Sequence, residues 1–194
     1  MNANVGMQMP VYAPVSAYVP GTSITYGTGA VIAEAVSASV SWERSDGRFY
    51  GDDVQLDSDN GVLGYTIDFE PTGLTDAVRA ALLGETLASS EYTINSAAAP
   101  DVGFGYIRTM RSSGANGTVG YTYEGWWYYK VKFGVSSEET RTKERSIEWR
   151  TPTLQGQGDG ISLDSTGKLA FAVHRTFDTF SLAESWLKAK AGIT

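Results

Sequence analysis

The chain has no cysteine and only one histidine among its 194 residues, and these two scarcities exclude several kinds of site. Without cysteine there is no disulfide framework, no thiolate nucleophile and no cysteine-based zinc site. A transition-metal centre would have to rely on carboxylates around a single imidazole. We therefore expect His174 to be a structural or surface residue, and we expect no metal ion or cofactor.

Long apolar runs are also missing. Residues 1–21 have neither a positively charged start nor an apolar stretch long enough for a signal peptide, and no later segment is long and apolar enough to span a bilayer. The sequence thus predicts a soluble chain with no membrane contact. A chain of this length is most simply one domain that buries a sizeable core.

Charge is distributed unevenly along the chain, whose net charge is −7. Between Glu43 and Asp76 nine carboxylates face only two arginines, whereas from Arg108 to Arg150 eight basic residues face five acids. Two solvated faces would explain this separation. The alternative is a surface that repels nucleic acid, since a basic surface would instead retain phosphates.

Period-two alternation of apolar and polar residues predicts strands through most of the chain. In the segment GYTIDFE, Tyr65, Ile67 and Phe69 share one face, and Asp68 and Glu70 share the other. Turn signals rich in Gly, Ser and Asn separate the alternating segments, so an antiparallel arrangement is expected. The other strand candidates are Ile32–Trp42, Val102–Met110, Val119–Tyr123, Ile147–Trp149 and Leu169–Val173.

Two segments have helical periodicity instead. In LTDAVRAALLGE, Thr75 is a candidate N-cap and Gly84 a candidate C-terminal stop. In SLAESWLKAKAG, Ser181 and Glu184 have the spacing of a capping box, and Gly192 ends the pattern. Short amphipathic helices among strands indicate an α+β fold that is mainly β.

Residues 1–29 differ from the rest because three prolines interrupt any regular element and apolar residues lie between them. We interpret this stretch as an N-terminal arm that docks on its own domain or on a neighbour, since disordered tails are usually poorer in apolar residues. Residues 30–194 then form a single β domain.

No motif supports catalysis. Asp68 and Glu70 could be the two carboxylates of a hydrolase. Two acids at positions i and i+2 of a strand are more simply explained as its solvent-exposed face. The run LDSDNG lacks the spacing and the glutamate of a calcium loop. The fragments GTGAVI and GFGYIR lack the strand–turn–helix context of nucleotide sites. We expect no enzyme activity and no catalytic residues.

The stretch WWYYKVKF concentrates aromatic residues. Alternate residues of this stretch lie on two faces. We expect the first face, which contains Trp127, to belong to the core and the second face, which contains Trp126, to be exposed. Exposed aromatics suit a sugar platform or a protein interface, and the acidic balance argues against nucleic acid as the ligand. A carbohydrate-binding β-sandwich that uses Trp126 and Tyr128 is therefore one functional hypothesis. The first face holds Trp127, Tyr129, Val131 and Phe133, and the second holds Trp126, Tyr128, Lys130 and Lys132.

Two blocks carry a family resemblance, from Tyr50 to Glu85 and from Trp126 to Gly156. They contain an acidic strand block, the short helix, the aromatic-lysine strand, a Ser-Glu-Glu-Thr loop and a Glu-Trp-Arg-Thr-Pro-Thr-Leu segment, in that order. This arrangement resembles the major tail proteins, or tail tube proteins, of long-tailed non-contractile (siphovirus-type) phages. The resemblance extends over roughly Ala35 to Gly192.

The resemblance implies a β-sandwich or barrel with a flanking helix, the fold of a phage tail tube protein. It implies a virion structural protein that self-assembles into hexameric rings, which stack into the hollow tube through which DNA passes during ejection without specific binding. The implied partners are further copies of the chain, a tape measure protein and a tail terminator. The implied location is the virion tail, and the host cytoplasm during assembly.

Within that hypothesis the candidate residues acquire roles. Acidic side chains facing a channel would repel phosphates, and Asp68 and Glu70 are the lumen-facing candidates. Unpaired strand edges would be used in ring formation. The candidates for subunit interfaces are Trp126, Tyr128, Arg141, Lys143 and Arg145, the last three as a basic loop that meets an acidic surface on the next ring.

Overall fold

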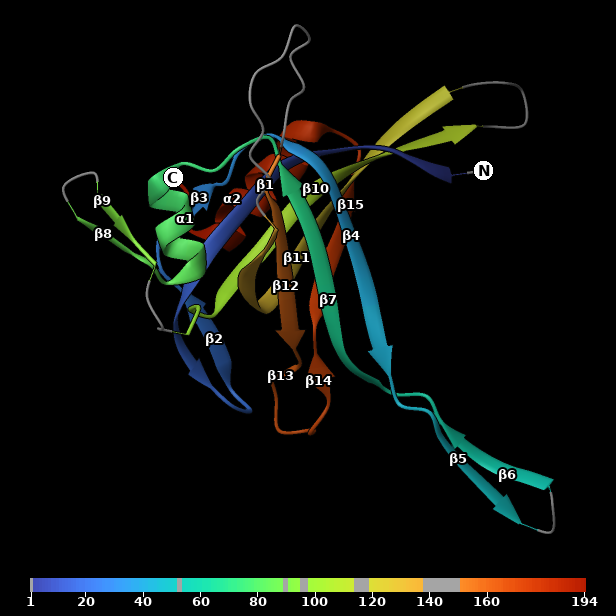
Figure 1. Cartoon of the computed structure of the whole chain (residues 1–194). Helices are drawn as coiled ribbons and strands as arrows, with labels where there is room; N and C mark the ends of the chain where they lie inside the picture. Colours follow the sequence, from blue (N-terminus) through green and yellow to red (C-terminus); the bar gives the residue numbers. More distant parts are fainter. Residues whose placement is uncertain (1, 52–53, 89–90, 95–97, 114–118, 138–150) are drawn as a thin grey trace, which may run out of the picture.

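A computed structural model of the chain describes residues 2–51, 54–88, 91–94, 98–113, 119–137 and 151–194 (Figure 1). Within these ranges, nine strands form one antiparallel sheet, three two-stranded hairpins lie outside it, and two helices pack against it. The prediction of an α+β, mainly β, antiparallel fold is confirmed.

The large sheet folds into two layers that share one long strand, β11. On the edge of β11 that does not face β10, residues 123–128 pair with β15, and residues from 131 to 137 pair with β12. The first layer contains β1 (Asn2–Val19), β10 (Val102–Ser113), the first half of β11 (Val119–Ser137) and β15 (Ala172–Phe177), with β2 (Ser23–Tyr26) and β3 (Ala30–Val31) paired to β1. The second layer contains the second half of β11, β12 (Thr153–Asp159), β7 (Val62–Pro71) and β4 (Ala35–Arg44).

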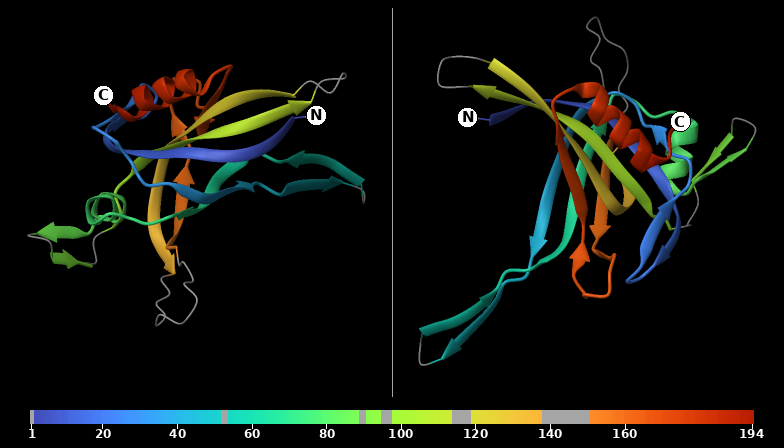
Figure 2. Two further views of the ribbon diagram at one scale, coloured as in Figure 1. Left: turned by 90° about the horizontal axis from the view of Figure 1, so that it is seen from above. Right: turned by 180° about the vertical axis from the view of Figure 1, so that it is seen from behind.

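The three hairpins lie at the periphery, and β5–β6 extends farthest from the two layers in each view (Figure 2). These hairpins are β5–β6 (Gly47–Gly51 and Val54–Asp59), β8–β9 (Thr86–Ala88 and Glu91–Thr93) and β13–β14 (Ile161–Ser162 and Leu169–Ala170).

A bulge in β11 marks the point at which the layers diverge. Phe104 lies opposite Tyr128, whereas Val102 lies opposite Val131, so two steps along β10 span three along β11. One extra residue reverses the face that every later side chain occupies. Tyr128 and Val131 therefore both point between the layers, although strict alternation assigns them to opposite faces.

Because of this bulge, the side chains of the aromatic stretch do not lie on the two faces that alternation predicts. Trp127 does not share a surface with Val131 and Phe133: it packs beneath the second helix, whereas the other two lie between the layers. Tyr128 was expected to be exposed, but only 1% of its surface is accessible. Alternation failed here because the inserted residue is not marked by glycine or proline.

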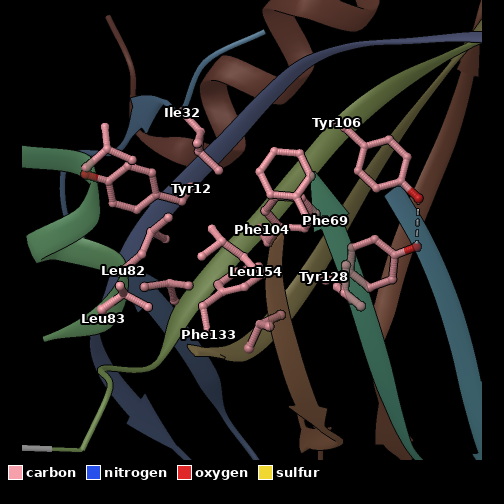
Figure 3. Packing of buried hydrophobic residues seen from close by; sticks show 14 of the residues in the cluster. Tyr12, Ile32, Phe69, Leu82, Leu83, Phe104, Tyr106, Tyr128, Phe133 and Leu154 are labelled. Atoms are coloured by element: carbon pink, nitrogen blue, oxygen red, sulfur yellow. Dashed lines mark hydrogen bonds between the residues drawn. The ribbon is translucent and has the colours of Figure 1, made fainter. Parts of the chain in front are cut away.

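Two apolar clusters stabilise the fold. Figure 3 shows the cluster between the layers, in which side chains from β1, β7, β10, β11, β12 and α1 interdigitate. A second cluster, between the first layer and α2, includes Trp127 and Leu187. Gly103 makes room for it, because a Cβ there would lie 2.2 Å from the Cζ2 atom of Trp127. Burial of large aromatic side chains of this kind contributes strongly to stability.

Helix α1 (Asp76–Leu83) begins and ends as the sequence predicts. The Thr75 hydroxyl accepts a hydrogen bond of 3.4 Å from the Val78 amide, and Gly84 terminates the helix with φ of 72°. A left-handed terminal residue favours glycine because a Cβ would be strained there. The helix buries Val78, Leu82 and Leu83 against the interior of the two layers.

Helix α2 (Phe180–Ala191) covers the outer face of the first layer and starts one residue before the expected Ser181. Its N-cap is Thr179, so the predicted capping box is wrong. Glu184 instead pairs with Lys188, at 2.8 Å between Oε1 and Nζ, one turn along the helix. The predicted end at Gly192 is confirmed, with φ of 64°.

The stretch expected to be an arm is part of the sheet. Strand β1 pairs with β10 along most of its length, from Asn2 opposite Ser112 to Pro14 opposite Val102. A register shift between Gln8 and Val11, with Met9 at a φ of 54°, accommodates the proline at position 10. The first residues thus dock on their own domain as a strand, because a bulge lets the ladder tolerate proline.

Candidate assembly surface

The second layer has one buried face and one polar face. Buried side chains of β7 and β12 alternate with exposed or half-buried ones. These outward positions align across the strands: Lys132, Gln157, Thr66 and Ser41 form one row, and Gly134, Gln155, Asp68 and Ser39 form the next. Hydroxyl, amide, carboxylate and ammonium groups therefore cover the outer face of this layer. We call it the polar face, and α2 lies on the other layer.

Asp68 and Glu70 both lie on the polar face, as the alternation of β7 predicts. Asp68 is exposed and accepts a 3.0 Å hydrogen bond from Nε2 of Gln155. Glu70 is half-buried and accepts hydrogen bonds from the hydroxyls of Ser37 and Thr151. Neighbouring polar groups hold both carboxylates in place on an open surface, which is the arrangement of a solvated wall.

The polar face is hollowed at one point. A shallow depression of about 300 Å³ lies between β11 and β12, lined by Lys132, Gly134, Gln155 and Gln157 together with parts of Phe133 and Val135. It exists because Gly134 has no side chain, and a Cβ there would meet no atom within 4 Å. Among the described residues no three histidine or acidic side chains gather closely enough to hold a metal ion.

Both long edges of the second layer lack a strand partner within the described chain. At one edge, β4 pairs with β7 and with no other described strand. At the other, β10 reaches β11 only as far as Val131, so the rest of β11 pairs with β12 alone. Open edges present unpaired backbone N–H and C=O groups, which favour pairing with another chain.

Trp126 is the centre of a stack that crosses three strands. Its ring lies against the His174 imidazole from β15, with centroids 4.5 Å apart and planes 15° apart. From β10, the Arg108 guanidinium lies 4.7 Å from the Trp126 centroid. The Trp126 indole donates a 3.2 Å hydrogen bond to Glu124. The stack therefore fixes the orientation of a half-buried tryptophan between two basic side chains.

This arrangement weakens the sugar-platform hypothesis. A platform needs two or more exposed aromatic faces, but Tyr128 is buried and the Trp126 ring is flanked by Arg108 and His174. The interface role expected for Tyr128 is likewise wrong for a direct contact, because the side chain points into the core. Its hydroxyl bonds to that of Tyr106, 3.2 Å away (Figure 3).

The remaining predicted interface residues, Arg141, Lys143 and Arg145, lie outside the described residues. Sequence reasoning did not single out Arg108, and it treated His174 as an isolated residue. Neither is close to Trp126 in the sequence, so only the register of β10, β11 and β15 brings the three together.

Two tyrosine hydroxyls bond to the backbone at the bulge of β11, one from each face of the strand. The Tyr26 hydroxyl donates to the carbonyl of Tyr129 at 2.8 Å, and the Tyr65 hydroxyl donates to the carbonyl of Lys130 at 3.1 Å. Burial raises the pKa of both hydroxyls above their ordinary value, and burial also raises the pKa of Tyr128. The fold therefore favours the neutral form of all three hydroxyls.

Alkaline pH should consequently unfold the chain. Because the folded-state pKa values are raised, this stabilisation is complete below the unfolded tyrosine pKa near 10 and is lost as pH rises above it. Three such groups would lower the free energy of unfolding by up to about 4 kcal/mol per pH unit above pH 10. Urea unfolding between about pH 8 and pH 12, followed by circular dichroism, measures this slope.

The variant Tyr26→Phe provides the control for the alkaline slope. It removes one titrating group and should make the dependence on pH shallower, despite an initial loss of about 1 kcal/mol from the missing hydrogen bond. A free energy of unfolding that stays constant up to about pH 12 would show that these hydroxyls are not kept neutral by the fold.

No helix in the described ranges is both long and apolar enough to cross a membrane.

Comparison with known proteins leaves the family open. No protein-family model matches the chain, and no curated protein matches it significantly.

Proposed function

We propose that this chain is the subunit of a phage tail tube, a virion structural protein whose hexameric rings stack into a conduit for DNA. The observation that carries the proposal is the second layer, with four strands, one buried face, one polar face and two open edges. The resemblance in the blocks Tyr50–Glu85 and Trp126–Gly156 supports the same function.

Ring formation would use the two open edges. A neighbour's β11 would pair with β4, so that the second layers of successive subunits form one continuous sheet. Such an interface is heterologous, because it joins two different surfaces of the subunit. It produces a closed ring when the rotation from one subunit to the next is a whole fraction of a full turn. Closure satisfies the open backbone groups of every subunit at once, which removes the edges from solvent.

The dimensions of such a ring suit a conduit. Six copies of the four-stranded layer give about 24 strands spaced about 4.8 Å apart, and a tilt of about 40° then gives a backbone diameter of about 48 Å. After side chains are added, the channel remains wider than a DNA duplex. With the polar face on the inside, Asp68 and Glu70 would line the channel and repel phosphates.

Thiol labelling of assembled tubes tests which face lines the channel, and the absence of cysteine makes any introduced thiol unique. In Asp68→Cys tubes, a small maleimide should react fully, whereas a maleimide coupled to a particle wider than the channel should react only at tube ends. In Leu182→Cys, on the outer side of α2, both reagents should react, because that side chain is 56% exposed and lies away from the second layer.

The bulky reagent should label unassembled Asp68→Cys and Leu182→Cys equally, which controls for intrinsic reactivity. If the bulky reagent modifies Asp68→Cys in tubes as completely as in monomers, the polar face is on the outer wall and the assignment of Asp68 to the channel is wrong.

A further inference from the structure

Arg108 is a partly buried cation whose partners are neutral. Its guanidinium donates a 2.9 Å hydrogen bond to the Tyr106 hydroxyl and lies over the Trp126 ring. Within the described chain no carboxylate lies within ion-pair distance of it; Glu124, opposite it on β11, instead accepts the Trp126 indole N–H. Removing a cation from water without an anionic partner is costly, so such a site favours an incoming carboxylate.

The geometry around Arg108 is fixed before any partner binds. Behind it, the hydroxyls of Tyr106 and Tyr128 form a bonded pair at the end of the core (Figure 3). Beside it, Trp126 is held between the guanidinium and the His174 ring. A rigid cation at the surface loses little conformational entropy when a partner binds.

The stack lies on the side of the molecule that carries β4. Ring contacts lead from Trp126 through the buried Tyr128 and Tyr65 to Trp42 on β4, which is 39% exposed. Helix α1 lies on the opposite side of the molecule in both Figure 1 and Figure 2. In a head-to-tail ring, the α1 side of one subunit therefore faces the β4 side of the next.

The exposed first turn of α1 carries a suitable anion. Asp76 is exposed, and no described residue pairs with its carboxylate. It points away from the face of α1 that Val78 and Leu82 bury in the interior. The chain has an excess of acids, with net charge −7, so a second copy is well suited to supply the anion that Arg108 lacks.

We propose that the stack of Arg108, Trp126 and His174 is a binding site for the Asp76 carboxylate of a neighbouring copy of this chain. The inference rests on the head-to-tail ring of the proposed function and specifies one of its contacts. Arg108 supplies a charge-assisted hydrogen bond, Trp126 supplies a flat apolar wall, and His174 holds that wall in place.

A charge-reversal and rescue experiment tests this contact. Arg108→Glu should raise the concentration needed for assembly by about 100-fold, the effect of losing a desolvated charge pair. Combining Arg108→Glu with Asp76→Arg should restore assembly to within about tenfold of the wild type. Arg111→Glu is the matched control, because Arg111 is exposed on the same strand and faces the other side of the sheet; its effect should stay within about threefold.

Sedimentation and electron microscopy give the assembly state, and thermal unfolding at low concentration shows whether each variant still folds. If Arg108→Glu forms rings as readily as the wild type, or if Asp76→Arg fails to rescue a folded Arg108→Glu chain, this contact is wrong, and the proposed pairing of strand edges is unaffected. A wild-type chain that remains monomeric at every concentration overturns both the contact and the proposed function.

Discussion

Replacing Gly158 by alanine is expected to destabilise the chain by about 3 kcal/mol, which corresponds to a fall of about 6–12 °C in Tm for a domain of this size. A Cβ at position 158 would lie 2.0 Å from Cζ of Tyr65. The Tyr65 ring cannot move aside easily, because its hydroxyl bonds to the Lys130 carbonyl and its faces contact Trp42 and Tyr128. Thermal and urea unfolding of the purified monomer measure the loss.

Gly134→Ala is the control for this substitution. Gly134 lies on β11, which pairs with β12, but on the polar face, where an added methyl group meets no atom within 4 Å. This variant should be as stable as the wild type or slightly more stable, since alanine reduces the entropy of the unfolded chain. Equal stability of Gly158→Ala and Gly134→Ala would mean that the packing of Tyr65 over β12 does not fix the second layer.

Val40→Lys is expected to prevent assembly while leaving a folded monomer. Val40 lies on the edge strand β4, opposite Ile67, with its side chain partly buried against the core between the layers. An inward-pointing lysine on an edge strand is a known means of blocking edge-to-edge pairing. In the monomer the ammonium can still reach water along the open edge. In the ring it would be buried without a partner, at a cost of several kcal/mol, so assembly should require at least about 100-fold more protein.

Ser39→Lys tests whether any lysine on β4 has this effect. Ser39 is on the same strand but on the polar face, where the ammonium remains in water and lies near Asp68 across the ladder. It should assemble at close to the wild-type concentration. Normal assembly of Val40→Lys would show that β4 is not at a subunit interface, and sedimentation velocity at rising concentrations distinguishes these results.

The parts of the fold that the sequence predicts are those governed by local rules. The alternation in β7 places Ile67 in the core and Asp68 in water, and the structure confirms both. The caps at Thr75 and Gly84 are likewise confirmed, because capping depends on the backbone of one turn.

Apart from the capping box predicted at Ser181, which fails because α2 begins at Phe180, the errors came from features that depend on pairing between distant segments. The bulge that turns Tyr128 inward is visible only in the register of β11 against β10. The proline at position 10 looked like a break in regular structure, but an irregular ladder on β10 accommodates it. The same limit applies to the candidate site. The aromatic stretch that contains Trp126 is evident from the sequence, whereas only the order of the strands brings Arg108 and His174 next to Trp126.

The packing also explains why glycine occupies positions in two stretches of the sequence, GFGYIR and GTGAVI. Gly103 and Gly105, in the GFGYIR segment, allow Trp127 to lie flat on β10, where a Cβ would approach its ring within 2.2 and 2.7 Å. Gly29, in GTGAVI, brings the chain close to the end of α2, and its amide donates to the Ala191 carbonyl at 2.8 Å. Close approach of backbone and side chain explains these glycines.

Electron microscopy of the purified wild-type protein at increasing concentration addresses the assembly directly. We expect six-fold rings that stack into hollow tubes, with β4 of each subunit paired to β11 of the next and the polar face around the channel. Isolated single copies at every concentration, or rings whose polar face forms the outer wall, would contradict the tail tube function proposed for this chain.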